Sequence, residues 1–517
     1  MAWDPELQEL ARRQELAKTM GGPESVARQH EHGKLTVRER IDALLDPGSF
    51  EEMASLAGHG EYADGELAEF TPATTVGGLG RIDGRRVVVT GTDFTIRGGS
   101  ATKPSHKGGM LGDIAYEFKL PFINLLDGAG ANIEGVSERG HTYLPSDYAV
   151  FKRPMQIMEQ APLICAVLGS VAGGPAGIAL LSHFNVMVKE TSALFASGPP
   201  VVKRALGHDL TKQELGGASI HTRESGCVDN AAEDELDAFR QIRTLLSYLP
   251  SNVWELPPVV PAQPPPDGWQ DGLSNIVPSN RKRPYSMKTL VSLCVDGGDF
   301  FEIAPDFGES LIVALARVDG HPIGIIANNA AKHGGALDQR AADKQGRFLD
   351  FCDVFHIPVA YFVDIPGFMI GQQAERAGTL RSGMRAIWIW QNITIPTFTV
   401  QVRKCYGMAG AATSDASRLS YRVAWPSGEF GSIPIEGGVS AAFRKDIEAS
   451  ADPQARMEEL EAELQVLRNV FRTAEAGGVE EIIDPVETRQ YLQRFVEMAY
   501  RTLEQDRGKK SRVGFRP

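Results

Sequence analysis

Two copies of one sequence pattern follow each other along this chain of 517 residues. Residues 80–85 (Gly-Arg-Ile-Asp-Gly-Arg) are echoed by residues 316–321, where Asp319 follows Asp83 by 236 positions. Residues 121–128 are echoed by 358–365 at an offset of 237, and residues 162–167 by 396–401 at an offset of 234. Because near-constant offsets over several segments indicate a duplication, the chain is expected to fold as two similar halves.

Each half alternates short apolar runs with longer segments of helical period. The runs at Val87–Val89, Phe122–Leu126 and Ile164–Leu168 have the length of buried strands, which is typical of βαβ units and largely parallel sheets. The sequence therefore predicts an α/β fold in each half.

A proline-rich stretch separates the two copies. Eight prolines between residues 249 and 280 should exclude any regular helix or central strand there. We interpret residues 250–280 as a linker, with an N-terminal domain over 1–275 and a C-terminal domain over 276–517.

Charge and cysteine usage exclude several classes of protein. The net charge of −13 repels phosphate backbones and anionic lipids, so neither nucleic acid nor a membrane is expected as a partner. The five cysteines are widely separated and form no C-x-x-C pair, which disfavours zinc sites and a disulfide framework. The chain has no signal-like segment at its start and no apolar run of about 18 residues, so we expect a cytoplasmic protein.

Two glycine-rich turns occupy equivalent positions in the two copies. Residues 172–177 (Ala-Gly-Gly-Pro-Ala-Gly) follow an apolar strand, and Pro175 is placed to open a helix. Their counterpart at 406–412 (Tyr-Gly-Met-Ala-Gly-Ala-Ala) is again a turn of small residues before a helix. Gly-Gly pairs are more often only tight turns, but N–H groups at a helix start attract anionic oxygen. The matched pair favours two oxyanion holes.

With these turns, the sequence resembles a known family, the carboxyltransferase (β) subunits of biotin-dependent acyl-CoA carboxylases, such as propionyl-CoA carboxylase β. The resemblance runs from about Gly33 to the C-terminus, and it implies two tandem crotonase-like (ClpP/crotonase) domains. Its motifs are residues 33–40 (Gly-Lys-Leu-Thr-Val-Arg-Glu-Arg), 93–95, 98–100, 128–131 (Gly-Ala-Gly-Ala), 172–174, 215–218, 244–250 and 363–368 (Val-Asp-Ile-Pro-Gly-Phe).

The resemblance implies a reaction in which carboxybiotin gives up CO2 and the α-carbon of an acyl-CoA attacks it. No side-chain base is needed in this scheme, because the biotin left by CO2 release takes the α-proton. Backbone N–H pairs are suited to the two enolate oxygens because they do not titrate. By the family pattern, Gly173 and Gly174 hold the thioester oxygen, while Met408 and Ala409 hold the biotin ureido oxygen.

Further site residues follow from the same pattern. Those expected to contact the substrate or the biotin, in addition to the four catalytic donors, are Gly128, Ala129, Gly130, Ala131 and Ala411 for the acyl-CoA, and Gly407 with Met408 and Ala409 for biotin.

The chain is not expected to carry its own biotin or to use ATP. Ser286-Met287-Lys288 lacks the flanking residues of a biotin attachment site, and no phosphate loop ending in Lys-Ser/Thr is present. Biotin is therefore expected on a separate carrier, with no metal in this chain. The resemblance implies a biotin carboxylase and biotin carrier (α) subunit as partner, and a homo-oligomer, by the family pattern a hexamer. Active sites would lie between the N half of one chain and the C half of another.

This chain departs from the common family pattern at the second turn. Many relatives have Gly-Gly-Ala-Tyr-Asp where residues 407–411 read Gly-Met-Ala-Gly-Ala. The N–H groups of Met408 and Ala409 survive, but the position of Ala411 becomes roomier and uncharged. Acetyl, propionyl, longer and polar-substituted acyl groups all stay open. Two alternatives to the carboxylase are a decarboxylase subunit that runs the transfer backwards and a non-catalytic crotonase-like scaffold.

Other candidates have simpler interpretations. Glu190 could act on water, but a single carboxylate at a strand edge is more often a solvated structural residue. Lys107, with Lys103 and His106, could contact CoA phosphates. Trp388 and Trp390 are expected in a core or a subunit interface rather than in a ligand site.

Overall fold

The computed structural model describes residues 3–100, 107–128, 130, 140–141, 149–281, 283–414 and 421–510. Contacts divide it into two compact units, unit 1 up to Glu255 together with the segment from Gly508 on, and unit 2 from Leu256 to Arg507. The returning segment is held by the Gly508 N–H, which donates to the Val253 carbonyl at 2.7 Å.

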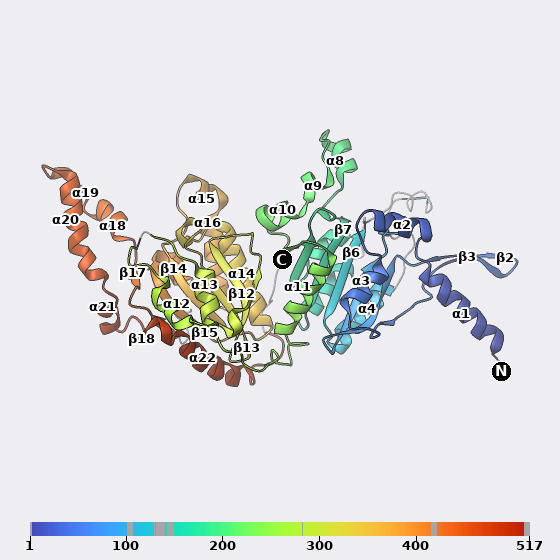
Figure 1. Cartoon of the computed structure of the whole chain (residues 1–517). Helices are drawn as coiled ribbons and strands as arrows, with labels where there is room; N and C mark the ends of the chain where they lie inside the picture. Colours follow the sequence, from blue (N-terminus) through green and yellow to red (C-terminus); the bar gives the residue numbers. More distant parts are fainter. Residues whose placement is uncertain are drawn as a thin grey trace. The chain divides into compact units, whose positions relative to one another are not determined.

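The two units repeat one sheet topology, as the duplication predicts (Figure 1). The sheet of unit 1 has the strand order β1-β4-β5-β6-β7-β8-β10, and β9 pairs with β7. The sheet of unit 2 has the order β11-β12-β13-β14-β15-β16-β18, and β17 pairs with β15. The strands of unit 1 are β1 (Glu51–Glu52), β2 (Gly58–Ala63), β3 (Glu66–Pro72), β4 (Thr75–Ile82), β5 (Arg85–Thr92), β6 (Phe122–Gly128), β7 (Leu163–Ala172), β8 (Phe184–Val188), β9 (Ala193–Phe195) and β10 (Asn230–Ala232). Those of unit 2 are β11 (Phe300–Ile303), β12 (Leu311–Val318), β13 (His321–Asn328), β14 (Val359–Ile365), β15 (Thr397–Tyr406), β16 (Tyr421–Ala424), β17 (Glu429–Gly431) and β18 (Glu481–Ile482).

Both sheets are mixed, with a parallel majority. In unit 1, β1, β4 and β5 pair antiparallel, and the neighbours from β5 across to β10 pair parallel. The carboxyl ends of β5, β6, β7 and β8 therefore meet at one edge of the sheet. Binding sites of parallel sheets lie at this edge. Both expected glycine-rich turns leave such an edge, one after β7 and the other after β15.

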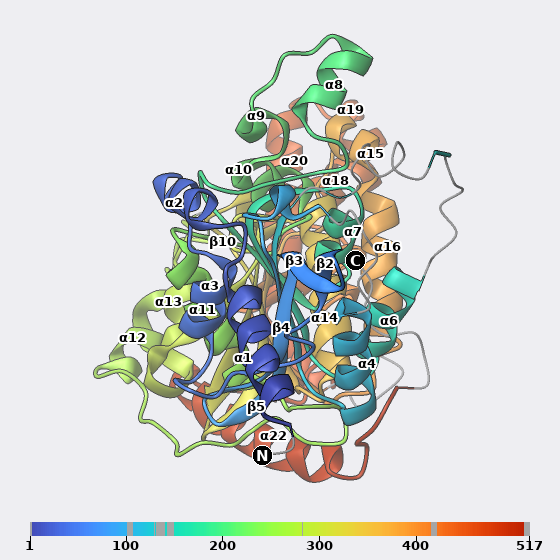
Figure 2. The same ribbon diagram turned by 90° about the vertical axis from the view of Figure 1, so that its right-hand side faces the viewer.

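Helices cover both faces of each sheet. In unit 1, the packing of the strand glycines places α4 (Lys107–Phe118) on one face and α3 (Val37–Leu44) on the other: a Cβ added at Gly77 would meet Leu111 of α4, and one at Gly91 would meet Val37 of α3. Helices α6 (Ala149–Met158) and α11 (Glu235–Tyr248) contact α4 and α3 respectively, and the sheet lies between these two layers (Figure 2). The strands are thus buried on both sides, which explains their continuous apolar runs.

Unit 2 is built in the same way. Alternate residues of β12, such as Ile312 and Ala314, belong to a core with α12 (Trp269–Ile276), α13 (Met287–Cys294) and α22 (Thr488–Leu503). The opposite face is covered by α14 (Gln339–Val354), which packs with α16 (Thr379–Trp390). The remaining helices of the two units are α1 (Asp4–Lys18), α2 (Pro23–Glu31), α7 (Gly174–Leu180), α8 (Pro199–Leu206), α9 (Lys212–Gly216), α10 (Ala218–Ile220), α15 (Gln372–Ala377), α17 (Gly407–Ala411), α18 (Ile435–Ala442), α19 (Arg444–Ala449), α20 (Pro453–Gln465) and α21 (Val470–Glu475).

The proline-rich stretch corrects one expectation. Residues 250–280 were expected to lack any regular helix, yet α12 occupies the gap of the chain between Pro266 and Pro278. The reason is that the segment between these two prolines contains no proline and is amphipathic, so that Leu273 on its apolar side packs into the core. The stretch also packs on unit 2, where the Val260 N–H donates to the Gly320 carbonyl at 3.1 Å. The extents 1–275 and 276–517 stay a prediction.

A capping box precedes the last long helix, α22. Asp484 caps the chain before α22, Pro485 follows it, and Glu487 completes the capping box by accepting from the Asp484 N–H at 3.0 Å. Within the described residues, no helix combines the length and the apolar character that crossing a membrane requires.

Candidate active site

The first glycine-rich turn lies at the carboxyl end of β7, where its backbone is open. Gly173 has φ 67° and ψ −128°, a backbone conformation that is strained for any residue with a Cβ atom. Both Gly173 and Gly174 are exposed, and a Cβ added at Gly174 would meet nothing within 4 Å. Gly174 and Pro175 open α7, so the Gly174 N–H belongs to the first turn, which has no intrahelical acceptors.

The Gly173 N–H has a partner within the chain. It donates to the Phe195 carbonyl at 3.2 Å, because β9 runs alongside the end of β7 and places Phe195 opposite Ala172. Pro175 has no N–H at all. Of the two expected donors, the Gly173 N–H is therefore engaged within the chain, whereas the Gly174 N–H lies in the first turn of α7 and has no intrahelical acceptor.

The end of β6 lies against this turn. A Cβ added at Gly130 would be 2.9 Å from the Ala172 carbonyl oxygen and 3.6 Å from the Gly174 nitrogen, so only glycine allows this approach. Gly128 is buried at the end of β6, where a Cβ would meet Thr92 at 3.0 Å. The structure thus brings Gly128 and Gly130 to the first turn. Ala129 and Ala131 lie outside the described residues.

The second turn repeats this arrangement after β15. Gly407 has φ 62°, and a Cβ there would approach the Ser432 carbonyl oxygen at 3.3 Å. Met408 and Ala409 follow in the first turn of α17, where N–H groups have no intrahelical acceptors. The Ala409 side chain is buried, whereas Met408 is 47% exposed and Ala411 is also exposed.

The strand ends align the two turns residue by residue. β7 ends at Ala172 and β15 at Tyr406, so Gly173 corresponds to Gly407 and Gly174 to Met408. The similar φ angles of Gly173 and Gly407 support this register. Ala409 then corresponds to Pro175, which means that its N–H has no equivalent in unit 1.

A buried charge network lies beneath the first turn. The Asp127 Oδ2 atom, just before Gly128, accepts from Lys34 Nζ at 2.8 Å, Arg40 at 3.0 Å and Gln29 at 3.2 Å. Arg40 also forms two hydrogen bonds with the Glu235 carboxylate and one with the Leu168 carbonyl in β7. Burial lowers the pKa of Lys34, although its ion pair with Asp127 opposes this shift. The network joins α3 and α11 to the strands that carry the site.

This network was not foreseen from the sequence, which marked residues 33–40 only as a motif. The sequence does hold one feature that reflects this network, which is the glycine within the apolar run of β7. A Cβ added at Gly169 would lie 1.9 Å from Asp127 Oδ1, so this strand position must be glycine. Unit 2 has Arg403 at the equivalent strand position, and Arg403 binds the duplicate carboxylate Asp364 at 2.9 Å. The two halves therefore keep the aspartate and change its cation.

We expect Arg40→Met to destabilise unit 1 by about 3–5 kcal/mol, because it leaves Glu235 and part of Asp127 buried without their charge partner. The free energy of unfolding in urea measures the change. Arg243→Met is the matched control, since its pairs with Asp46 and Asp83 are half-exposed and should contribute less than about 1 kcal/mol. Equal losses in the two variants would contradict a structural role for the network.

Burial and contacts describe the surroundings of the other candidate residues. Lys107 is buried and donates to Glu52 at 2.9 Å, so it does not offer its charge to a phosphate; Lys103 and His106 lie outside the described residues. Trp390 is fully buried and Trp388 is 52% exposed, in keeping with a core and a surface position. Glu190 is exposed.

The segment Ser286-Met287-Lys288 is structural. Ser286 caps α13, Met287 is fully buried, and Lys288 pairs with Glu302 at 2.6 Å. Among the described residues, no group of three or more His, Cys, Asp and Glu side chains is arranged to hold a metal ion.

Comparisons with known proteins agree over nearly the whole chain. Residues 28–513 match the model of the carboxyl transferase domain. The propionyl-CoA carboxylase carboxyltransferase subunit of Haloferax mediterranei is 37% identical over 499 residues, which cover 95% of each chain. The methylmalonyl-CoA carboxyltransferase 12S subunit of Propionibacterium freudenreichii is 35% identical and covers 98% of this chain and 97% of its own.

A solved structure shares the fold. The transcarboxylase 12S crystal structure, a hexamer assembly with methylmalonyl-CoA and methylmalonic acid bound, superimposes with a TM-score of 0.87 at 34% identity. The alignment covers 99% of this chain and 98% of that chain. The two tandem α/β units are thus those of a crotonase-like carboxyltransferase, and the chain belongs to the carboxyl transferase family.

Proposed function

We propose that this protein is the carboxyltransferase subunit of an acyl-CoA carboxylase, which moves CO2 from carboxybiotin on a separate carrier to the α-carbon of an acyl-CoA. The observation that carries the proposal is the similarity over the whole chain to acyl-CoA carboxyltransferases, including a structure with methylmalonyl-CoA bound. The comparisons do not favour the decarboxylase or the scaffold.

The first turn is assigned to the acyl-CoA. We assign the Gly174 N–H as the donor to the thioester oxygen as it gains negative charge, with Gly173 holding the turn in shape. A preorganised main-chain donor suits this role because it neither titrates nor moves. Gly128, Ala129, Gly130 and Ala131 form the adjoining substrate wall, which is supported by the contact of Gly130 with the turn.

The second turn is assigned to biotin. Biotin supplies a ureido group that carries the transferable carboxylate. Gly407 shapes the turn, and the N–H groups of Met408 and Ala409 donate to the ureido oxygen. Both residues lie in the first turn of α17, where donors lack acceptors. The exposed Ala411 has a small side chain that leaves room for acyl groups of varied size.

The assembly is proposed from the same relatives. We assign the protein to a homohexamer, because the transcarboxylase 12S protein, which shares its fold over nearly the whole chain, assembles as a hexamer. Biotin comes on a carrier that a biotin carboxylase subunit loads, in the cytoplasm.

An assay with added biotin carboxylase and biotin carrier tests the proposed function. The chain is incubated with a biotin carboxylase, biotinylated carrier, ATP and labelled bicarbonate, and with acetyl-, propionyl-, longer-chain and polar-substituted acyl-CoAs in turn. We expect acid-stable label in at least one acyl-CoA, only when the chain is present. Carrier that binds the chain while no acyl-CoA becomes labelled would contradict the proposal and support a scaffold.

A further inference from the structure

Four polar side chains lie together in the core of unit 2, beneath the second turn. They are Asn328 from β13, Gln345 from α14, Tyr361 from β14 and Thr399 from β15, and all four are buried. A buried polar group costs stability unless it is hydrogen-bonded, and apolar side chains would fill the same space without that cost. The partners of these four side chains therefore indicate their role.

Two of their hydrogen bonds end on the backbone that follows α17. Gln345 Nε2 donates to the Ala412 carbonyl at 2.8 Å, and Thr399 Oγ1 donates to the Thr413 carbonyl at 3.0 Å. Ala412 and Thr413 directly follow the helix, at the end whose carbonyl groups lack intrahelical donors. The two side chains thus tie the carbonyl end of α17 to the core of unit 2.

The orientation of the Gln345 amide is fixed from both ends. Its Nε2 faces the Ala412 carbonyl, which can only accept, and its Oε1 accepts from the Tyr361 hydroxyl at 3.2 Å. The same hydroxyl accepts from Asn328 Nδ2 at 3.3 Å, and Asn328 Oδ1 accepts from the Asp364 N–H at 3.1 Å. Hydrogen bonds thus run without a break from β13 and β14, through Gln345, to the end of α17.

Helix α17 depends on such support because it is short. It has five residues, of which Ala409 is buried and Met408 and Ala411 are exposed. A helix of this length is not stable by itself, so directional hydrogen bonds from the core are suited to fix it. The donors assigned to biotin, Met408 and Ala409, lie within about one turn of Ala412. A shift of the carbonyl end would therefore also move these N–H groups.

In unit 1 a glycine takes the place of Gln345. Gly108 of α4 precedes Gln345 by 237 positions. Lys119 and His356, which follow the two helices and have left-handed φ angles of 55° and 56°, are separated by the same 237 positions. The connections from helix to strand therefore match in length, and this match supports the correspondence of Gly108 with Gln345.

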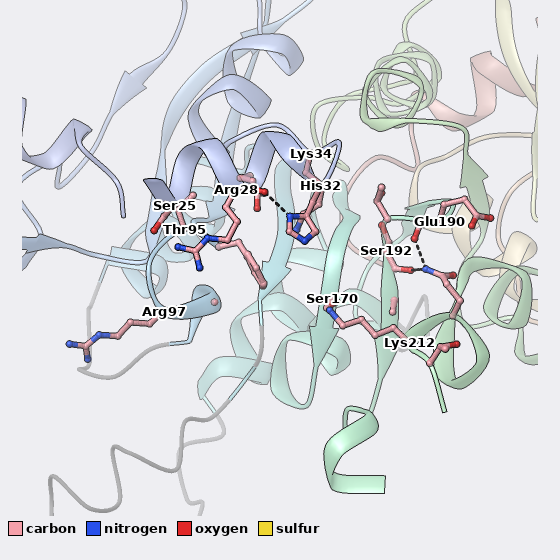
Figure 3. A pocket seen from close by; sticks show the side chains of 17 residues that line it. Ser25, Arg28, His32, Lys34, Thr95, Arg97, Ser170, Glu190, Ser192 and Lys212 are labelled. Carbon is pink, nitrogen blue, oxygen red and sulfur yellow. Dashed lines mark hydrogen bonds between the residues drawn. The ribbon is translucent and has the colours of Figure 1, made fainter. Parts of the chain in front are cut away.

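The first turn is supported instead from the strand beside it. Gln213 of α9 donates to the Glu190 and Ser192 carbonyls at 2.7 and 2.8 Å (Figure 3). Ser192 directly precedes β9, whose Phe195 accepts the Gly173 N–H. The core glutamine of unit 2 therefore serves the second turn and is not part of the fold that the two units share.

We propose that Gln345 is a positioning residue for the biotin half of the site and that Thr399 assists it. The two side chains hold α17 so that the Met408 and Ala409 N–H groups point at the ureido oxygen. Both side chains are buried, so they act through α17 rather than on the reactants. The inference rests on the proposed function, because biotin is the ligand assigned to this turn.

Gln345→Met removes both hydrogen bonds of the side chain at nearly constant volume. We expect it to slow the release of CO2 from carboxylated carrier, measured without acyl-CoA, by about tenfold, because displaced donors lose much of their effect on the transition state. The dissociation constant of acyl-CoA should stay within about twofold, since the first turn is unaltered. A loss of stability alone would not separate these two quantities.

Gln160→Met is the matched control. Gln160 is also a buried glutamine, and its Nε2 donates to the Tyr116 carbonyl at 2.6 Å. It precedes β7 in unit 1, whereas the first turn follows that strand. The control removes a bond of the same kind far from the second turn, so the release of CO2 should be unchanged. Circular dichroism and urea unfolding show whether each variant is folded.

Thr399→Val and Thr399→Ser give an independent comparison. Valine resembles threonine in shape but lacks the hydroxyl group that donates to Thr413, whereas serine keeps it. We expect the valine variant to slow the release of CO2 and the serine variant to restore a rate close to that of the unmodified protein. Equal rates in the two variants would contradict the role of this hydroxyl group.

Hydrogen exchange of the peptide that spans residues 406–414 tests the positioning without an assay of activity. In the full chain we expect faster exchange in Gln345→Met than in Gln160→Met. Equal exchange in these two variants, or equal release of CO2 by them in active protein, would overturn the proposal. An unmodified chain that releases no CO2 would refute the proposed function instead, and the exchange rates would still decide whether Gln345 positions α17.

Discussion

Gly174→Pro is expected to slow carboxyl transfer to acyl-CoA by about 10²- to 10³-fold, because it removes the main-chain donor assigned to the thioester oxygen. Proline is tolerated in the first turn of a helix, and Gly174 already occupies the first position of α7, so the fold should survive. The measurement is kcat for transfer from carboxylated carrier to acyl-CoA at saturating substrate.

Gly174→Ala is the matched control for this variant. It adds a methyl group where nothing lies within 4 Å and keeps the N–H, so its kcat should stay within about threefold of the unmodified protein. If the proline variant matches the alanine variant, the Gly174 N–H is not a catalytic donor.

Ala409→Pro is expected to have an effect of similar size on the other half of the reaction. The substitution deletes the N–H of the third residue of α17, which we assign to the biotin ureido oxygen, and should lower turnover by about 10²- to 10³-fold. Binding of acyl-CoA should stay largely intact, since the first turn is unaltered. Turnover and the dissociation constant of acyl-CoA are measured on the same sample.

The control for Ala409→Pro is Ala409→Gly. Glycine keeps the N–H and loses one buried methyl group, which costs about 1 kcal/mol of stability but leaves the donor in place. Turnover close to that of the unmodified protein in both variants would refute the second oxyanion hole.

The sequence was informative about the fold because the duplication repeats local patterns. Apolar runs that are buried on both faces, such as Phe122–Leu126 in β6, were recognisable as strands. The capping box at Asp484 and Glu487 is a local pattern of four residues, the kind of signal that a sequence shows directly.

Contacts between segments that are far apart in the sequence could not be predicted from such local patterns. The bond from the Gly173 N–H to Phe195 depends on β9 pairing with β7, and no local pattern around Gly173 reports that pairing. The Arg40–Asp127–Glu235 network joins three segments that are each unremarkable in sequence. Side-chain convergence of this kind follows from topology rather than from spacing along the chain.

The alignment of the two turns shows the same limit. Offsets in sequence relate the halves to within a few residues, whereas the strand ends fix Gly173 to Gly407 and Gly174 to Met408. This register makes the Ala409 N–H specific to unit 2, because Pro175 stands at the equivalent position. The two oxyanion holes are therefore proposed to be related but not identical.

The claim that two separate main-chain donors serve two separate oxygens is tested most directly by the rate at which the protein releases CO2 from carboxylated carrier without any acyl-CoA. This reaction uses only the biotin half of the site. The account predicts that Ala409→Pro slows it by about 10²-fold or more while Gly174→Pro leaves it unchanged. Equal rates in both proline variants, whether slowed or not, would contradict the assignment of the two turns.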